Sequence, residues 1–193
     1  MLNIWKEKIH AGRVNYRIMQ DKNKKFVRAD SNGTASGIYY EPKKYNPEFR
    51  PYISWKWKVD QFPKKDPEQK ETLKDDFAAR VYVIFPANIF ILSRAIEYIW
   101  DDVLEEGTIT RSPLSGRIKL FVIRNGKKPD WVTEERNVYQ DYLEAFGEEP
   151  EDFDDKVGAV AFMTDTDDSQ SKARAYFDEM KIGYSAPLFQ AKP

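Results

Sequence analysis

The sequence predicts a mainly β fold: a jelly-roll type antiparallel β-sandwich of about eight strands, with one or two short helices in the connections. Apolar and polar side chains alternate with a period of two, most clearly in Tyr52–Val59 and Phe77–Phe85, which is typical of antiparallel strands. Turn-forming residues separate such segments, for example Asn125-Gly126. The 193 residues contain no repeat and no flexible linker, so we expect a single domain, 1–193.

The segment Tyr52–Val59 is the clearest strand, and it carries a pair of tryptophans. Trp55 and Trp57 share one face and lie about 7 Å apart along the strand. An exposed pair would stack against sugar rings, whereas a buried pair would fill the interior of the sandwich. Ile53 and Val59 lie on the same face, and this favours burial.

Seven further segments are expected to be strands, and two segments break the pattern. The strands are Asn15–Met19, Phe26–Asp30, Gly37–Glu41, Phe77–Phe85, Arg117–Arg124, Val157–Thr164 and Lys172–Tyr184. Asn88–Val103 has apolar residues at helical spacing, with Asn88 as its expected N-cap. Val138–Phe146 is the second expected helix, ended by Gly147. The acidic stretch Glu148–Asp155 is interpreted as a solvated loop.

Composition excludes several classes of function. The chain has no cysteine, which removes disulfides and thiolate metal sites. Its net charge of −1 lacks the basic excess that nucleic-acid binding requires, and no apolar run reaches the roughly 18 residues of a membrane span. The single histidine, His10, cannot form a His-based zinc site or a catalytic triad. We therefore expect a soluble protein without nucleic-acid partners.

The location of the protein stays open at this level. The first ten residues lack the apolar stretch of a signal peptide. The expected location is cytoplasmic, or periplasmic or secreted if a leader has been removed.

Arg80 is the most informative single residue, because it interrupts an otherwise apolar face of an expected central strand. A buried guanidinium requires an acidic partner. The candidates are Asp165 or Asp167, Glu135 and Asp141. Either these groups form a buried ion-pair network that fixes the strand order, or Arg80 clamps an anionic ligand or sugar hydroxyls.

Asp165, Asp167 and Asp168 follow an expected strand directly and are candidates for a Ca²⁺ site. The EF-hand pattern fails, because Gln170 and Tyr176 occupy the positions that need Gly and Glu. The alternative is a polar turn with side-chain to backbone hydrogen bonds. No other cofactor is expected.

Glu135, Arg136 and Asn137 precede the short expected helix that contains Asp141. Glu135 and Asp141, together with Asp165 or Asp167, could provide the carboxylate pair of a glycosidase. The sequence does not show how far apart these carboxylates lie.

The chain resembles the bacterial family known as domain of unknown function 3047. The matching stretches are Arg28–Ser31, Ala35–Gly37, Ser54–Val59, Asp75–Val83, Glu135–Tyr139 with Asp141–Tyr142, Met163–Asp167 and Ala173–Tyr176. The family has no assigned activity, and its members commonly carry export signals. More loosely, the paired tryptophans and the Ala-Tyr-Phe-Asp strand are similar to galactose-binding-like jelly rolls, many of which bind carbohydrate. This second likeness is an analogy of fold only.

Three functional hypotheses follow. The first is a non-catalytic, carbohydrate-binding-like domain, with a ligand site formed by the residues named above: Arg80, Glu135, Arg136, Asn137, Asp141, Asp165 and Asp167. The second is a carboxylate-pair glycoside hydrolase or lyase, which requires two acids facing each other across an open cleft. The third is a structural or interaction module with a buried charge network.

Overall fold

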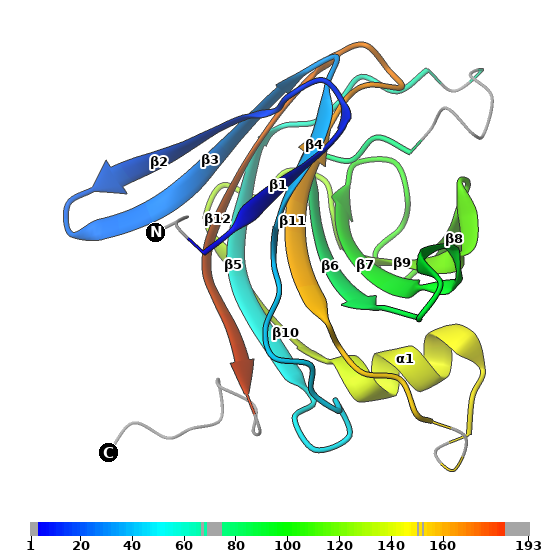
Figure 1. The fold of residues 1–193 in the computed structure, drawn as a ribbon. Coiled ribbons are helices and arrows are strands. Elements are labelled where there is room, and N and C mark those ends of the chain that lie inside the picture. Colours follow the sequence, from blue (N-terminus) through cyan, green and yellow to red (C-terminus); the bar gives the residue numbers. More distant parts are fainter. Residues whose placement is uncertain (1–3, 67, 69–74, 150, 152, 184–193) are drawn as a thin grey trace.

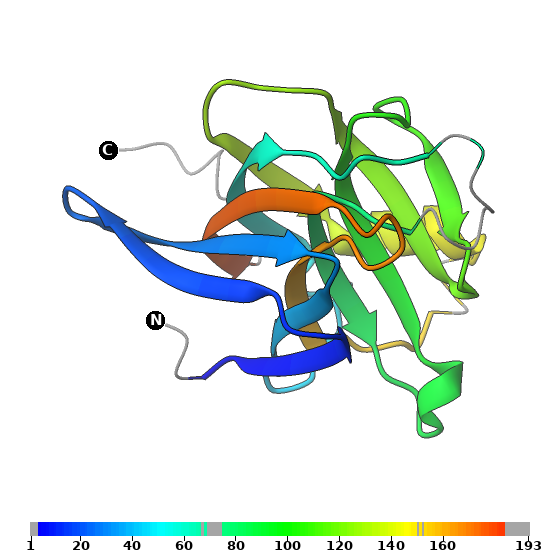
Figure 2. The ribbon, with the colours of Figure 1, turned by 90° about the horizontal axis from the view of Figure 1, so that it is seen from above.

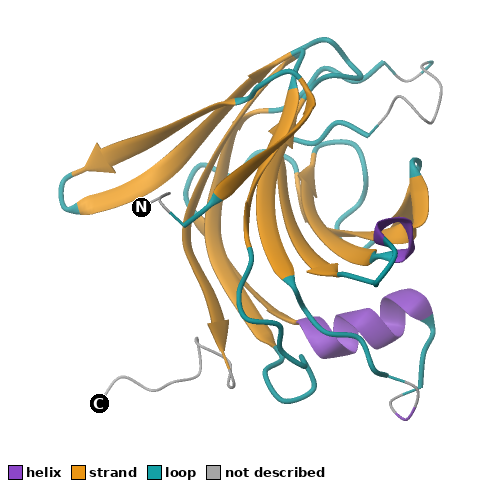
Figure 3. Cartoon of the chain, viewed as in Figure 1, coloured by secondary structure: helices purple, strands orange, loops and turns teal. Residues whose placement is uncertain are grey.

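The computed structural model describes the whole chain except residues 1–3, 67, 69–74, 150, 152 and 184–193. The described residues form two β-sheets that pack face to face, and one α-helix lies at one end of the sandwich (Figures 1 and 3). The predicted mainly β sandwich is confirmed. No helix among these residues is long and apolar enough to cross a membrane.

The larger sheet has seven strands in the order β1-β4-β11-β6-β7-β9-β8. Their bounds are β1 Lys6–Ala11, β4 Ala35–Tyr40, β6 Ala79–Phe85, β7 Arg94–Asp101, β8 Ile109–Ser112, β9 Ser115–Asn125 and β11 Ala159–Asp165. All neighbours pair antiparallel except β7 and β9, which run parallel. The sheet is therefore mixed, whereas the sequence predicted a purely antiparallel sandwich.

The smaller sheet has five antiparallel strands in the order β10-β5-β12-β3-β2. Their bounds are β2 Asn15–Asp21, β3 Lys24–Asn32, β5 Tyr52–Gln61, β10 Val132–Asn137 and β12 Lys172–Gly183. The β2–β3 hairpin extends beyond the rest of the sandwich (Figures 1 and 2). The expected last strand reached Tyr184, which lies outside the described residues.

All eight expected strand segments coincide with strands, but the described residues contain twelve strands in all. The additional strands are β1, β7, β8 and β10. Strands β1 and β8 expose most of their side chains. Their sequences therefore lack the alternation of apolar and polar residues that predicts a strand.

The expected helix Val138–Phe146 is confirmed as α1 with the same bounds. Asn137 caps it, because its side-chain oxygen accepts a hydrogen bond from the backbone N–H of Gln140 at 3.1 Å. Gly147 ends it with a φ of 64°, a conformation that glycine adopts without strain.

The expected helix Asn88–Val103 is wrong. This stretch forms a short 3-10 helix, Phe90–Leu92, and then strand β7, Arg94–Asp101. Every residue of β7 from Ala95 to Asp101 is buried. Because both faces of this strand are covered, the period-two alternation is missing and the apolar residues coincide with helical spacing.

The interior of the sandwich contains a chain of aromatic rings. Trp55 and Trp57 are 1% and 0% exposed, and their ring centroids lie 5.4 Å apart. Tyr98 packs against Trp55 at 5.3 Å, and Trp100 packs against Trp57 at 5.5 Å. The tryptophan pair therefore belongs to the core, in agreement with the burial that its strand face favoured.

Candidate functional site

Arg80 is buried in a group of acidic side chains on the outer face of the seven-stranded sheet. It is 2% exposed. Its Nε donates to Oδ1 of Asp165 at 2.9 Å, and its Nη2 donates to Oδ2 of the same residue. Its Nη1 donates to Glu97 at 3.2 Å and lies 3.4 Å from Asp75. The predicted ion pair with Asp165 is confirmed, and Glu97 and Asp75 are partners that the sequence did not reveal.

The expected convergence of Arg80 with residues 135–141 is not found. Arg80 lies opposite Ile99 in the β6–β7 pair. The neighbouring residue, Tyr98, therefore points to the other face of the sheet. Its hydroxyl donates to Asp141 at 2.6 Å, so Asp141 lies on the interior side. The sheet itself separates the two groups.

The residues before and within α1 form a cluster of their own. Arg136 donates from Nε to Asp141 at 2.9 Å, which completes a Tyr98–Asp141–Arg136 contact. Asn137 is engaged as the helix cap, and Glu135 lies opposite Ser54 in the β10–β5 pair. These contacts position α1 against the sheets. Whether any of these residues binds a ligand stays a prediction.

The turn after β11 brings acidic groups together. Carboxylate oxygens of Asp76, Asp165 and Asp167 all lie within 4.8 Å of one another, and oxygen donors of this kind suit Ca²⁺. Asp168, the third residue of the predicted site, instead accepts a hydrogen bond from the backbone N–H of Asp75 at 3.3 Å. Asp76, to which no sequence pattern pointed, accepts from two backbone N–H groups of the turn, those of Asp168 and Ser169, at 3.2 and 2.6 Å.

Burial controls the protonation of the acids around Arg80. Together with the nearby Asp75 and Asp165 carboxylates, it raises the pKa of Glu97 to about 8 against the opposing effect of Arg80. Burial likewise raises the pKa of Asp165 to about 7. Both acids contact Arg80 directly and are almost fully covered. This arrangement favours a structural network over a glycosidase carboxylate pair, which requires an open cleft.

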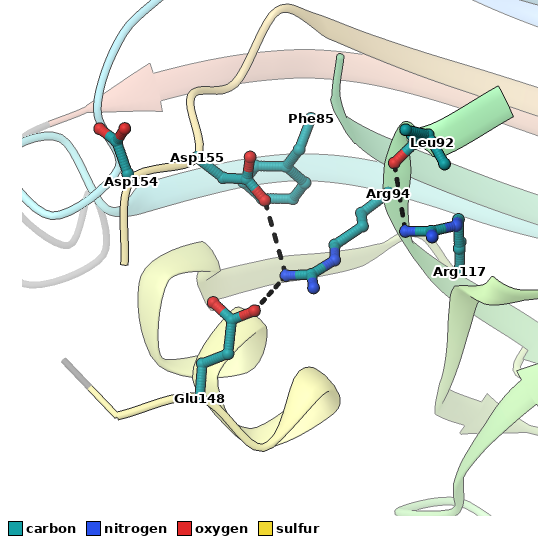
Figure 4. Close-up of a pocket in the computed structure, with 7 residues that line it drawn as sticks. All are labelled: Phe85, Leu92, Arg94, Arg117, Glu148, Asp154 and Asp155. Atoms are coloured by element: carbon teal, nitrogen blue, oxygen red, sulfur yellow. Dashed lines mark hydrogen bonds and ion pairs between the residues drawn. The ribbon is translucent and has the colours of Figure 1, made fainter. Parts of the chain in front are cut away.

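The described residues contain a polar pocket elsewhere, beside α1 (Figure 4). Its volume is about 320 Å³, at the lower end of the range for small-ligand pockets. Two arginines, three acids and two apolar side chains line it: Arg94, Arg117, Glu148, Asp154, Asp155, Phe85 and Leu92. We call this cavity the Arg94 pocket.

Arg94 connects the polar groups on several sides of the pocket. Its Nη1 donates to Glu148 and to the hydroxyl of Tyr142, and lies 3.7 Å from Asp155. Arg117 reaches the pocket from β9 and donates to the carbonyl of Leu92 at 3.4 Å (Figure 4). The pocket thus contains one arginine fixed by acidic groups and a second arginine whose contact is to the backbone.

No local sequence pattern indicates this pocket, because its lining residues come from distant parts of the chain, between Phe85 and Asp155. Arg94 lies within Asn88–Val103, the segment expected to be a helix. Glu148, Asp154 and Asp155 belonged to a stretch interpreted as a solvated loop, of which residues 150 and 152 lie outside the described part. Only the paired arrangement of β6, β7 and β9, with the chain returning past α1, brings these side chains together.

Several solved structures share the general architecture. A family 11 carbohydrate-binding module of the cellulosomal cellulase Lic26A-Cel5E of Clostridium thermocellum is 11% identical, with a TM-score of 0.48 over 92% of this chain and 86% of that chain. The xyloglucanase domain of NopAA, a type three effector from Sinorhizobium fredii, is 8% identical, with a TM-score of 0.45 over 96% and 100%. Endoglucanase 3 of Trichoderma harzianum, from family GH12, is 9% identical, with a TM-score of 0.45 over 94% and 99%. Likenesses this distant describe the fold and carry no argument about function.

Sequence comparison is more specific. None of the curated proteins matches the chain. A model of one protein family, described as "Protein of unknown function (DUF3047)", matches residues 3–181. This match covers nearly the whole domain, including both sheets and α1, and it confirms the resemblance found in the sequence. The chain belongs to the DUF3047 family.

Proposed function

We propose that this protein is a non-catalytic carbohydrate-binding domain and that the Arg94 pocket binds a neutral sugar. The observation that carries the proposal is the lining of this pocket. Guanidinium and carboxylate groups surround one opening beside the side chains of Phe85 and Leu92. Charged planar groups of this kind form strong hydrogen bonds, often in pairs, and adjacent sugar hydroxyls offer both donors and acceptors to them.

The charge of the lining favours a neutral ligand. Two arginines face three acids, Glu148, Asp154 and Asp155, so the lining has one negative charge in excess. An acidic sugar would therefore meet net repulsion. The apolar surface of Leu92, which is 42% exposed, can cover the C–H face of a sugar ring, while the polar groups fix its orientation.

The contacts within the pocket favour binding over catalysis. A glycosidase needs one carboxylic acid that donates a proton and a second carboxylate across the scissile bond. Glu148 and Asp155 both lie against the same guanidinium, that of Arg94. Glu97 and Asp165, whose pKa values are raised, contact Arg80 and are sealed from solvent. We propose that the Arg80 network organises the fold.

A glycan-array screen with Arg117→Ala tests the proposal. Arg117 reaches the pocket without an ion pair among the described residues, so its removal should leave the fold intact. We expect the wild-type domain to bind neutral glycans and the variant to lose at least tenfold in affinity, as expected when a charged hydrogen-bond donor is removed.

The matched control is Arg13→Ala, because the side chain of Arg13 is 70% exposed and pairs with Glu7 outside the pocket. This variant should bind as the wild type does. The proposal would be contradicted if the wild-type domain bound no glycan on the array, or if the Arg117→Ala variant bound as tightly as the wild type.

A further inference from the structure

The outer face of the five-stranded sheet carries a row of basic and aromatic side chains. Four residues on neighbouring strands stand in turn directly opposite one another: Arg17 of β2, Arg28 of β3, Tyr176 of β12 and Lys58 of β5. Adjacent strands lie about 4.8 Å apart. Val27, the neighbour of Arg28, is buried in the core, so the alternation of side chains directs the row away from the other sheet. We call these four residues the Arg17–Lys58 row.

Three arginines on this face share a single acid. Asp30 accepts from Nε and Nη2 of Arg28 at 2.7 and 2.9 Å, from Nε of Arg174 at 2.7 Å and from Nη2 of Arg17 at 3.0 Å. Partial burial raises the pKa of Asp30, but these hydrogen bonds lower it overall, to about 2. The carboxylate is therefore ionised at neutral pH. It balances one of the three positive charges and leaves an excess of two.

The positive excess continues along the β2–β3 hairpin. Residues 15–32 contain five basic residues and two acids, a net charge of +3, whereas the whole chain has a net charge of −1. The hairpin extends beyond the rest of the sandwich (Figures 1 and 2). The side chains of Arg17 and Arg174 are 51% and 37% exposed. The excess charge is thus open to a ligand in solution.

The other end of the row is aromatic, and its charges are balanced. The ring of Tyr176 packs against those of Phe26 and Trp131, with centroids 5.8 and 6.1 Å apart. Trp131 remains 38% exposed. Lys58 pairs with Asp60 at 3.2 Å. This face therefore joins a cationic half, on β2, β3 and β12, to an exposed aromatic half.

We propose that this face binds an acidic oligosaccharide, whose carboxylates contact the arginines while one sugar ring lies against Trp131. The two-point contact of Arg28 with Asp30 shows that these guanidiniums are placed to hold a carboxylate. A guanidinium carries several N–H donors. Arg17 and Arg174 each give one to Asp30, so further donors of both can hold a second carboxylate.

The extent of the charge favours a sugar acid over a nucleic acid. Nucleic-acid binding depends on neutralising many closely spaced phosphates, whereas the excess here ends where Lys58 pairs with Asp60. A uronic acid chain carries one carboxylate on each ring, and each ring also has an apolar C–H face for the aromatic half. The site is independent of the Arg94 pocket, whose lining has an excess of negative charge.

Three ligands test the proposal by isothermal titration calorimetry at low ionic strength: a galacturonic acid trisaccharide, its methyl ester and an oligothymidylate of equal charge. The acidic trisaccharide should bind saturably, and added salt should weaken its binding. The methyl ester keeps the rings but loses the charges, so it should bind at least tenfold more weakly. The oligothymidylate should also bind more weakly than the acidic trisaccharide.

Matched variants locate the site. Arg17→Gln removes one of three arginines around Asp30 and should lower the affinity for the acidic trisaccharide about five- to tenfold. Arg111→Gln, at an exposed position of the edge strand β8 in the other sheet, should leave it unchanged. Trp131→Ala should weaken the binding of the acidic trisaccharide, and it serves as the second variant if Arg17→Gln does not fold.

Arg117→Ala, which tests the Arg94 pocket, should bind the acidic trisaccharide as the wild type does, so the two proposals fail separately. The present proposal is overturned if the methyl ester or the oligothymidylate binds as tightly as the acidic trisaccharide. It is also overturned if folded Arg17→Gln or Trp131→Ala protein keeps the wild-type affinity, or if Arg111→Gln loses as much affinity as Arg17→Gln.

Discussion

Arg80 and Asp165, which stand 85 positions apart in the chain, form a two-point contact between neighbouring strands β6 and β11. Oδ1 of Asp165 also accepts the backbone N–H of Phe77 at 3.0 Å. The carboxylate of Asp165, at the end of β11, therefore binds both the side chain of Arg80 in β6 and the backbone of Phe77, which precedes β6. The alternating pattern of Phe77–Phe85 showed that Arg80 would be buried, and the pairing of the strands explains how its charge is compensated.

The Arg80–Asp165 pair predicts a large difference between single and double substitution. Arg80→Met alone leaves buried carboxylates without their cation and should lower the free energy of unfolding by about 3–5 kcal/mol. Adding Asp165→Asn removes one charge and keeps the acceptor for Phe77, so the double variant should recover at least half of this loss. Urea unfolding of the three proteins measures the effect. Equal destabilisation of both variants would mean that Arg80 contributes through more than charge compensation.

Glu97 predicts a pH dependence of stability. In the folded protein its pKa is about 8, against an ordinary value of 4.5. Between these values the folded state holds a proton that the unfolded chain has released. Stability should therefore fall as the pH rises through this window, by up to a few kcal/mol. Glu97→Gln, which stays neutral, should flatten the dependence of the melting temperature between about pH 5 and 8. A variant with the wild-type slope would exclude Glu97 as the source.

The cluster of Asp76, Asp165 and Asp167 gives a direct test of the predicted Ca²⁺ site. If the cluster binds Ca²⁺ in the folded state only, a concentration about 100 times the dissociation constant adds about 2.7 kcal/mol to stability. The melting temperature of chelator-treated protein should then rise by several degrees on addition of Ca²⁺. Asp167→Asn should abolish the rise, whereas Asp130→Asn, at an exposed loop position, should preserve it. No shift in the wild type would refute the site.

The sequence revealed those features that follow from local alternation and local turns. The strand Tyr52–Val59, the burial of Trp55 and Trp57, and helix α1 between Asn137 and Gly147 all have signals within a few residues. Strand β7 has no such signal, because both of its faces are buried and its pattern matches a helix equally well. That single error concealed both Glu97, a partner of Arg80, and Arg94, the centre of the polar pocket.

The candidate sites depended on information that no local pattern holds. Asp141 is one of the acidic partners expected for Arg80, yet the two lie on opposite faces of one sheet. The Arg94 pocket combines residues from Phe85 to Asp155. Its formation depends on the parallel pairing of β7 with β9, and a purely antiparallel scheme does not contain that pairing.

The most direct test of the carbohydrate proposal is to locate the bound ligand by the NMR signals of arginine side chains. A neutral oligosaccharide selected on the array is titrated into ¹⁵N-labelled protein, and the Nε–H resonances are followed. We predict saturable shifts of Arg94 and Arg117, with Arg13 and the buried Arg80 unchanged. Shifts confined to arginines outside the pocket, or none at all, would contradict the account.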